Sequence, residues 1–362
     1  MKKKVCVYAI CKNESKFVRS WMESMAEADL VCVLDTGSTD GTPELLKELG
    51  AQVSCSEIIP WRFDVARNRS LDLVPLDADI CVCTDLDERF EPGWRDKLEQ
   101  AWIPGTQTAK YLYNWRLKPD GTPDVQMMYF KIHARFGFKW VCPVHEVLVW
   151  QLKGSPKTAW VDGVVLTHYP DKEKSRDSYL GLLEAGVSED PTNERMAYYL
   201  GREYMFNKRW QDCIRTLDLY LKNPLATWEE ERCAAMRWIA CSFAELGEDV
   251  LARRWHLRAI AECPRMRDAY TEAAQMEYSR KNWIRVFFFC EEALKIKEKS
   301  KVFVNQGYAW DHTLDDLASI ACYQLGMTER SLAHAEAALA LNPDDARLIG
   351  NARLLREKVG VK

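Results

Sequence analysis

Two acidic residues that could bind a metal ion directly follow an apolar run. Residues 80–83 are apolar, and Asp85 and Asp87 come next, in the sequence VCTDLDERF. Side chains two positions apart in an extended chain point to the same side, so this spacing places both carboxylates together. Mg²⁺ or Mn²⁺ takes one or two carboxylates and completes its shell with phosphate oxygens. We predict that this pair binds a divalent cation and a diphosphate, the alternative being a helix cap or a solvated turn.

Two further polar side chains suit a nucleotide. Asp35 follows residues 30–34 in LDTGSTDGT, where glycines and Asp40 predict a tight turn before a helix. Its carboxylate could accept a hydrogen bond from a base imide or a ribose hydroxyl, the alternative being a capped helix entrance. Arg67, in WRFDVARNRSL, has a planar guanidinium that suits a pyrimidine carbonyl or a diphosphate, the alternative being an ordinary surface arginine.

The elements that must position these residues alternate between strand and helix. The pattern predicts helices from about residue 15, from about 42 and across 63–73, between strands at 5–10, 30–34, 52–58 and 80–84. Such alternation favours a parallel sheet with helices on both faces, and ligands then bind beyond the carboxyl ends of the strands. From about residue 108 the strands lengthen, with a hairpin signal at 119–122, so we expect the sheet to become mixed.

The rest of the chain is predicted to be helical and repetitive. Turn residues recur 17 positions before a proline in three pairs, Asn207 and Pro224, Gly247 and Pro264, Gly326 and Pro343. These segments resemble tetratricopeptide repeats, with a degenerate copy at 265–298 and an insertion near 302–313, which makes about four repeats. The predicted domains are 1–170 and 171–362. Stacked repeats commonly hold an extended peptide; alternatively, they brace the first domain or form a homodimer.

The motifs AICKNE, VLDTGSTDGT, WRFDVARNRSL and CTDLDERF, in this order, resemble the nucleotide-binding half of family 2 glycosyltransferases. With KIHARFGFKWVCPVHEVL, LTHYPDK and the repeats, the chain is similar in architecture to the bacteriocin S-glycosyltransferases. The resemblance implies an α/β GT-A catalytic domain, Rossmann-like with a mixed, mainly parallel sheet, followed by an all-α repeat domain. It also implies an inverting transferase that uses a nucleotide-sugar, most often a UDP-sugar, with Mn²⁺ or Mg²⁺.

The resemblance also implies roles for individual residues. Asp35 and Arg67 would hold the nucleotide, with Lys12 and Glu14 nearby. The metal-bound diphosphate would lie on Asp85 and Asp87. His168, in LTHYP, could complete the metal shell, since some GT-A enzymes use a histidine from this late position. The alternative for His168 is a partly buried histidine at a domain junction.

Glu146 is the predicted general base. Inversion needs a carboxylate on the face of the sugar opposite the leaving diphosphate, close enough to take the acceptor proton. The sequence PVHEVL stands where many family members have an acidic pair, so His145 is the alternative. Consecutive extended residues point to opposite sides, so only one of the two is expected to enter the site. A zinc protease is excluded, because Val149 replaces the second histidine of H-E-x-x-H.

Composition sets limits on the partners. The net charge of −4 shows no basic excess, so nucleic acid is not favoured, although residues 253–301 are locally basic. No apolar run reaches the ~18 residues of a membrane span. The thirteen cysteines include no C-x-x-C pair, and the N-terminus is unlike a signal peptide, so we expect a cytoplasmic protein without disulfides.

Together, these observations predict a metal-dependent inverting glycosyltransferase that acts on a hydroxyl or thiol, with a peptide or protein as one candidate acceptor. Three alternatives remain open. The first is a non-catalytic tetratricopeptide scaffold with a degenerate GT-A domain. The second is a sugar nucleotidyltransferase, which would release pyrophosphate, and the third is a glycosyltransferase acting on modified nucleic acid.

Overall fold

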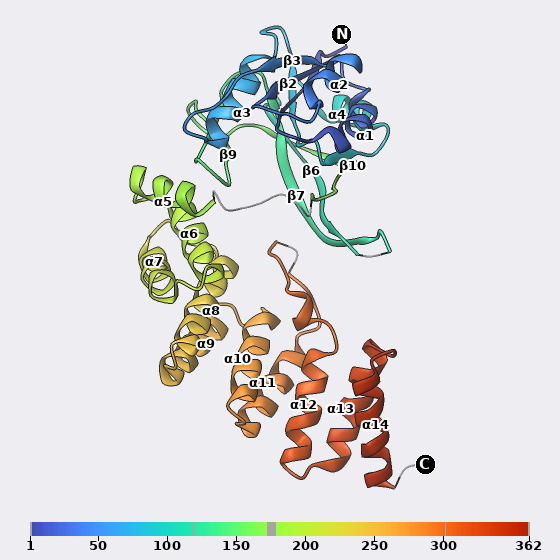
Figure 1. Cartoon of the computed structure of the whole chain (residues 1–362), viewed down its shortest axis with the longest axis vertical. Coiled ribbons are helices and arrows are strands. Elements are labelled where there is room, and N and C mark those ends of the chain that lie inside the picture. The colour runs from blue at the N-terminus through green and yellow to red at the C-terminus, as the bar shows by residue number, and fades with distance from the viewer. Residues whose placement is uncertain (1, 119, 172–178, 301, 361–362) are drawn as a thin grey trace. The chain divides into compact units, whose positions relative to one another are not determined.

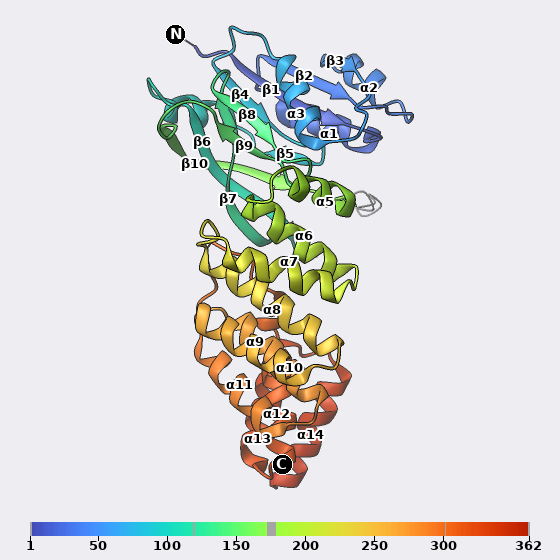
Figure 2. The same ribbon diagram turned by 90° about the vertical axis from the view of Figure 1, so that its left-hand side faces the viewer.

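The computed structural model describes residues 2–118, 120–171, 179–300 and 302–360 (Figure 1). The chain divides into two compact units, Met1–Glu189 and Asp190–Lys362. The first contains the sheets, and the second is helical (Figure 2). No helix in the described part of the chain is long and apolar enough to cross a membrane.

The first part of unit 1 alternates strands and helices as the sequence predicts. The parallel strands are β1 (Val5–Cys11), β2 (Leu30–Asp35), β3 (Gln52–Cys55) and β4 (Ile80–Cys83). The helices between them are α1 (Ser15–Met25), α2 (Thr42–Glu48) and α3 (Phe63–Asp72). The strands lie in the order β3-β2-β1-β4, so β1 is central and its carboxyl end lies between those of β2 and β4.

The other half of the sheet contains antiparallel pairs. It consists of β5 (Glu88–Phe90), β6 (Thr108–Leu117), β7 (Pro123–Ala134) and β10 (Thr158–His168), in the order β7-β6-β10-β5 after β4. β7 is antiparallel to both β4 and β6, and β5 is antiparallel to β10. The unit also has a two-stranded sheet of β8 (Phe138–Val141) and β9 (Val147–Trp150), and helices α4 (Trp94–Ala101) and α5 (Tyr179–Glu189).

This topology corrects the predicted fold class. The sheet is mixed as predicted, but the expected GT-A domain, Rossmann-like with a mixed, mainly parallel sheet, is wrong, because strand–helix alternation builds only half of this eight-stranded sheet and a long hairpin with the strands beside it makes the other half. β6 and β7 pair directly without a helix between them, so the chain must reverse its direction in the sheet. Within the predicted hairpin turn, the N–H of Lys118 donates to the carbonyl of Thr122 at 2.8 Å. Pro119 lies outside the described residues.

Both faces of the central strand β1 are buried, and this packing holds its carboxyl end, beside which the candidate site lies, in place. All seven residues of β1 are buried. On one face Val7 packs in a cluster with Trp21 and Trp94, and on the other Tyr8 packs in a cluster with Trp140. Full burial of a large apolar side chain stabilises a fold by about 1.5–3 kcal/mol, so these contacts hold β1 firmly in register.

Unit 2 is a row of helical hairpins, which confirms the predicted repeats. The four hairpins in its described residues are α6 (Glu194–Phe206) with α7 (Trp210–Lys222), α8 (Glu229–Glu245) with α9 (Asp249–Glu262), α10 (Arg267–Ser279) with α11 (Trp283–Lys295), and α12 (Thr313–Gln324) with α13 (Thr328–Leu341). Helix α14 (Ala346–Val359) packs on α13. The first helices pack in series, α6 on α8, α8 on α10 and α10 on α12.

One backbone conformation recurs in every hairpin turn. The residue two positions before each second helix has a positive φ, and these residues are Lys208 (57°), Gly247 (79°), Lys281 (57°) and Gly326 (77°). Glycine adopts this conformation without steric cost, whereas a lysine is strained there. The predicted insertion between α11 and α12 contains the 3₁₀ helix η1 (Gly307–Ala309), which packs on α10 and α12.

Candidate functional site

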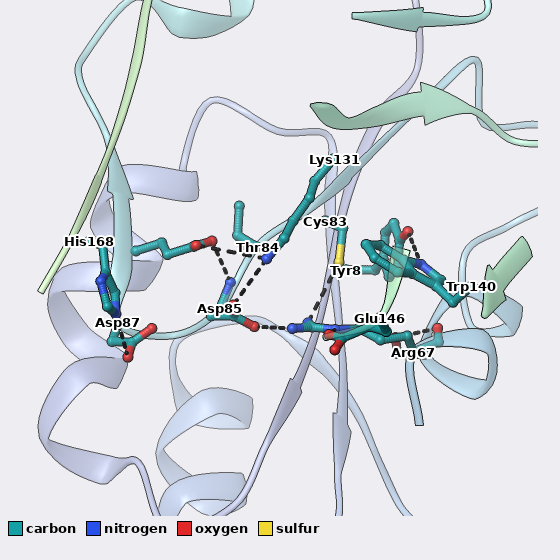
Figure 3. Close-up of polar contacts among 12 residues, drawn as sticks. Tyr8, Arg67, Cys83, Thr84, Asp85, Asp87, Lys131, Trp140, Glu146 and His168 are labelled. Carbon is teal, nitrogen blue, oxygen red and sulfur yellow. Dashed lines mark hydrogen bonds and ion pairs between the residues drawn. The ribbon is translucent and has the colours of Figure 1, made fainter. Parts of the chain in front are cut away.

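The candidate site begins where β4 ends. The chain does not continue as a strand through the acidic residues but turns, and the N–H of Glu88 donates to the carbonyl of Asp85 at 3.0 Å. Leu86 is buried at the centre of this turn. The two aspartates therefore do not follow the side-to-side alternation of an extended chain, and they have different partners (Figure 3).

Asp85 is held by two buried cations. Its carboxylate contacts the guanidinium of Arg67 and lies 3.1 Å from the Nζ of Lys131 (Figure 3). Burial by itself would raise the pKa of Asp85, but the charges and hydrogen bonds of the two cations outweigh it, and the pKa is lowered. Asp85 is therefore ionised and already neutralised by protein groups.

Lys131 and Glu88 complete the charged cluster, and neither was singled out in the sequence. The Nζ of Lys131 lies 3.8 Å from Glu88, whose carboxylate also accepts hydrogen bonds from Tyr113 Oη at 2.8 Å and from the N–H of Asp85 at 2.9 Å. Burial disfavours the charge of Lys131, yet the carboxylates hold its pKa well above the usual value. The pKa of Glu88 is raised, chiefly by burial. The only signal in the sequence is a lysine within the apolar strand segment YFKIHA.

Arg67 joins three parts of the unit. It lies on α3, is 3% exposed, and donates from Nε to Glu146 at 3.0 Å as well as contacting Asp85. Its guanidinium also lies over the ring of Trp140, 5.7 Å from the centroid. The fold thus brings together three predicted site residues, Arg67, Asp85 and Glu146, from α3, the β4 turn and the β8–β9 connection.

Glu146 and His145 point to different neighbours, although the chain is not extended at this point, since His145 has a positive φ of 52°. Glu146 is directed towards Arg67 (Figure 3), whereas the ring of His145 meets the ring of Tyr179 edge-on, with 5.7 Å between the centroids. Of these two residues, only Glu146 belongs to the charged cluster.

Asp87 pairs with His168 on the other side of the turn. The Nε2 of His168 lies 3.4 Å from the Asp87 carboxylate (Figure 3). Its Nδ1 lies 3.1 Å from the carbonyl oxygen of Trp115. Burial lowers the pKa of His168, but the hydrogen bond and charge of Asp87 outweigh this and raise it. The described residues contain no group of three or more His, Cys, Asp or Glu that could hold a metal ion. Describing the chain as metal-binding therefore has no support in this arrangement, because Asp85, Asp87 and His168 do not come together as one group of ligands.

Asp35 lies at the end of β2 and is used by its own turn. Its carboxylate accepts hydrogen bonds from the N–H groups of Gly37 and Ser38 at 3.0 Å each and from the Cys11 thiol at 3.4 Å. Asp40 accepts from the N–H of Thr42 at 3.1 Å, at the start of α2. Burial would raise the pKa of Asp40, but hydrogen bonds lower it to about 2.

The two predicted residues that precede α1 have different environments. Lys12 is exposed, whereas Glu14 is buried and donates from its N–H to Thr42 Oγ1 at 2.9 Å. This bond ties the start of α1 to the start of α2.

The cluster of Arg67, Asp85, Glu88, Lys131 and Glu146 is the main chemical feature of this sheet edge. Buried charges with strongly shifted pKa values occur at functional sites, where they serve as acids, bases or anion-binding groups. They also occur in ion networks that only support a fold, and each member here has a partner within the cluster. The geometry is compatible with both roles.

Comparison with solved structures finds likenesses of low sequence identity to parts of this chain. No family model matches the chain. It is similar to MamA at 18% sequence identity, over 47% of this chain and 91% of MamA, with a TM-score of 0.39. It is also similar to a thermophilic TPR protein of Thermus thermophilus at 12% identity, over 49% of this chain and 89% of that protein, with a TM-score of 0.35. A third similar structure is the first TPR of Spaghetti (RPAP3), solved with an HSP90 peptide. The identity is 12%, over 36% of this chain and 98% of that chain, with a TM-score of 0.30.

These comparisons contradict the family that the motifs suggested. The structures that the chain resembles are tetratricopeptide-repeat proteins, and no family model supports the motifs of the first unit. The identification as a family 2 glycosyltransferase, similar to the bacteriocin S-glycosyltransferases, is therefore wrong. One of these motifs, VLDTGSTDGT, consists largely of glycine and short polar residues, which ordinary turns and helix caps also require, as the turn around Asp35 and Asp40 illustrates.

Proposed function

We propose that this chain is a protein-binding scaffold whose helical unit holds a partner protein. The observation that carries the proposal is a set of large apolar side chains exposed on the second helices of three successive hairpins. Their exposed fractions are 62% for Leu219 on α7, 76% for Val250 and 53% for Leu257 on α9, and 69% for Ile284 and 54% for Phe288 on α11.

Stacked repeats do not need these side chains exposed for their own stability. Each hairpin buries a separate stripe against its neighbours, for example Val286, Cys290 and Ala293 on α11. Single exposed apolar residues are common on protein surfaces, but apolar groups repeated over successive elements mark interaction surfaces. Extended surfaces of this kind are what repeat stacks present to partners.

In this proposal the first unit has no reaction to perform. Its charged cluster joins α3, β4 and β7 through paired buried ions, and such a network specifies the fold without any chemistry. The repeats would then be the part of the chain that other molecules recognise.

The test is chemical cross-linking of the full chain in its native cells, followed by mass spectrometry of the cross-linked peptides. We expect a stoichiometric partner whose cross-links reach lysines of unit 2, such as Lys222. A Leu219→Ser, Ile284→Ser double variant should lose that partner without a change in its melting curve. Absence of any stoichiometric partner, or cross-links to unit 1 alone, would contradict the proposal.

As a second candidate, we propose that the first unit transfers a sugar from a nucleotide-sugar to an acceptor hydroxyl or thiol. A UDP-sugar is the first donor to test. The charged cluster favours it, because a buried guanidinium and a carboxylate meet beyond the carboxyl ends of parallel strands, where ligands of α/β sheets bind. Glu146 would take the acceptor proton while the bond from the sugar to the diphosphate breaks and the bond to the acceptor forms.

The divalent cation stays a prediction within this second candidate. Asp87 and His168 lie together, but Asp85 is occupied by Arg67 and Lys131, so a diphosphate would have to supply most of the oxygen ligands. Mn²⁺ or Mg²⁺ bound there would neutralise the leaving diphosphate.

Hydrolysis and transfer assays with UDP-sugars, with and without Mn²⁺, test the second candidate. We expect release of UDP, and loss of turnover with retained donor binding in Glu146→Gln. Release of pyrophosphate from a nucleoside triphosphate would indicate a nucleotidyltransferase instead. A correctly folded chain that neither binds nor hydrolyses any UDP-sugar would rule the candidate out.

A further inference from the structure

We infer that a groove on α9 and α11 binds an acidic amphipathic segment of the partner protein. The groove has a volume of about 530 Å³ and is lined by Val250, Arg253, Arg254, Leu257, Arg258, Ala261 and Arg285. This inference rests on the proposed function of unit 2 as a partner-binding scaffold, and it adds the location and the chemistry of the partner.

Five of the seven lining residues form one face of α9. Positions 250, 254, 257, 258 and 261 recur at helical spacing, and all five side chains are exposed. The opposite face holds the residues that α9 buries, Ala252, Trp255, His256 and Ala259. The helix thus has one face for the repeat core and a second face, partly apolar and partly cationic, directed away from it.

The groove carries an excess of positive charge. Arg253 and Arg285 share a single carboxylate, that of Glu277, with the Nη1 of Arg285 3.5 Å from it. Arg254 and Arg258 have no carboxylate partner among the residues that the structure describes, and Arg258 lies over the ring of Trp255, 3.8 Å from its centroid. Among the described residues these four guanidinium groups form ion pairs with one carboxylate, that of Glu277, and the nearby Asp249 is paired with Arg280. The groove is therefore complementary to a segment with several acids.

Part of the surface of the first helices is already covered by the chain's own insertion. Tyr308 Oη contacts Glu272 of α10 and lies 3.2 Å from Arg237 of α8, and the N–H of Gln306 donates to Asp268 at 2.8 Å. With these side chains in use inside the molecule, the groove on the second helices is the better candidate for a partner.

The lining also selects the chemistry of the partner. Arginine binds carboxylates through two parallel hydrogen bonds, while the methyl groups of Val250 and Leu257 need apolar side chains opposite them. A helix with acids on one side and leucines on the other satisfies both, as in other helix-in-groove complexes. The phosphate backbone of a nucleic acid would satisfy the arginines but would leave the aliphatic groups uncovered.

Fluorescence polarisation with defined probes tests the inference on the full chain. The probes are a labelled synthetic helical peptide with glutamates and leucines on adjacent faces, the same peptide with glutamine for glutamate, and the acidic peptide with its leucines scrambled. We expect the acidic amphipathic peptide to bind at least about tenfold more tightly than either control, and its affinity to fall with added salt.

Charge reversal locates the site. The Arg254→Glu, Arg258→Glu double variant should bind the acidic peptide at least about tenfold more weakly than the parent protein, since two charge-assisted contacts become repulsive. Arg353→Glu on α14 changes another exposed arginine and should leave binding unchanged. All three positions are exposed, so melting curves should match the parent protein.

Three results would overturn the inference: equal affinity for the acidic and glutamine peptides, unchanged binding by the Arg254→Glu, Arg258→Glu variant, or tighter binding of a single-stranded RNA than of the acidic peptide. The cross-linking experiment separates this failure from that of the proposed function. If a cross-linked partner binds the Arg254→Glu, Arg258→Glu variant normally, the groove is not its binding site, but the scaffold function stands. If no partner is found, the scaffold function itself is wrong.

Discussion

At the scale of single residues, Arg67 shows how this fold accommodates a buried charge. The guanidinium is 3% exposed and has a carboxylate on two sides, Asp85 and Glu146. Burial opposes its charge, yet these carboxylates raise its pKa well above the ordinary value. The arginine and the two carboxylates therefore each compensate the buried charge of the other.

Removing this arginine should destabilise unit 1. In Arg67→Met the two carboxylates lose their shared partner, and leaving a buried charge uncompensated typically costs about 3–5 kcal/mol. Urea denaturation of the variant should show that loss. Arg69→Met, an exposed position on the same helix, is the control and should change stability little. Equal stability of both variants would mean that the cluster relaxes without its arginine.

A second residue-scale prediction uses two glycines of unit 2. A Cβ on Gly201 would clash with the side chain of Leu217, whereas one on Gly350 would have nothing within 4 Å. Gly201→Ala should destabilise the α6–α7 hairpin by about 1–3 kcal/mol through overpacking. Gly350→Ala, within α14, should stabilise by about 0.5–1 kcal/mol because alanine favours the helix. Thermal unfolding of the two variants should shift in opposite directions.

The residues of the candidate site were only partly predictable. Arg67 and Glu146 were singled out for their chemistry, but their contact joins positions 79 apart and depends on where the β8–β9 connection lies. Lys131 and Glu88 were missed because their meeting requires β7 to pair antiparallel to β4, and a local pattern contains no information about that pairing. The turn after Cys83 was missed because Leu86 fits a strand as well as it fits a buried turn.

At the scale of elements, His334 joins three helices. Its Nδ1 lies 2.8 Å from Asp315 on α12 and its Nε2 lies 3.0 Å from Glu291 on α11, while the residue itself is on α13. The hydrogen bond to Asp315 is the largest influence on the pKa of His334, which is raised despite burial. The imidazole thus links α11, α12 and α13, and its protonated form is the one that the two carboxylates favour.

The stability of unit 2 should therefore depend on pH with a definite sign. Because the folded pKa of His334 is raised, its contribution is complete below the unfolded pKa of about 6.5 and is lost as pH rises through the folded pKa. We expect the melting temperature of this unit to fall as the pH rises from about 6 to about 9. In His334→Gln that part of the slope should disappear, and an unchanged slope would assign it to other groups.

Elements were predicted better than their pairing. The strands and helices up to residue 83 and the repeat hairpins followed from periodicity and turn residues, which are local properties. The hairpin signal at 119–122 predicted the antiparallel pairing of β6 with β7. The pairing of β7 with β4 and of β10 with β6 was not predictable in the same way, because it depends on contacts between strands that are distant in sequence. That difference explains why the fold class was wrong although most of its elements were right.

At the scale of the whole molecule, the two units have separate cores. Contacts group into Met1–Glu189 and Asp190–Lys362, and the clusters around Trp21 and around Ala273 belong to different units. Calorimetry of the full chain should show two unfolding transitions. Arg67→Met should shift one of them and Gly201→Ala the other. A single transition that moves with both variants would mean that the units unfold as one.

Net charge is also a whole-molecule property that conceals local ones. The overall value of −4 suggests no preference for an ionic partner, yet the groove around Arg254 and Arg258 is strongly cationic. Averaging over 362 residues removes such a feature, because acids elsewhere in the chain cancel it. Partner chemistry has to be inferred from each surface separately.

The positive φ before every second helix has a consequence for how such arrays are detected. Two of the four turns place lysine, not glycine, in that position, at Lys208 and Lys281. A motif search that demands glycine there would therefore register only alternate copies and underestimate the array by half. A search for the fixed spacing between the turn residue and the start of the next helix would recover all four. Spacing is therefore a better signature of these hairpins than residue type.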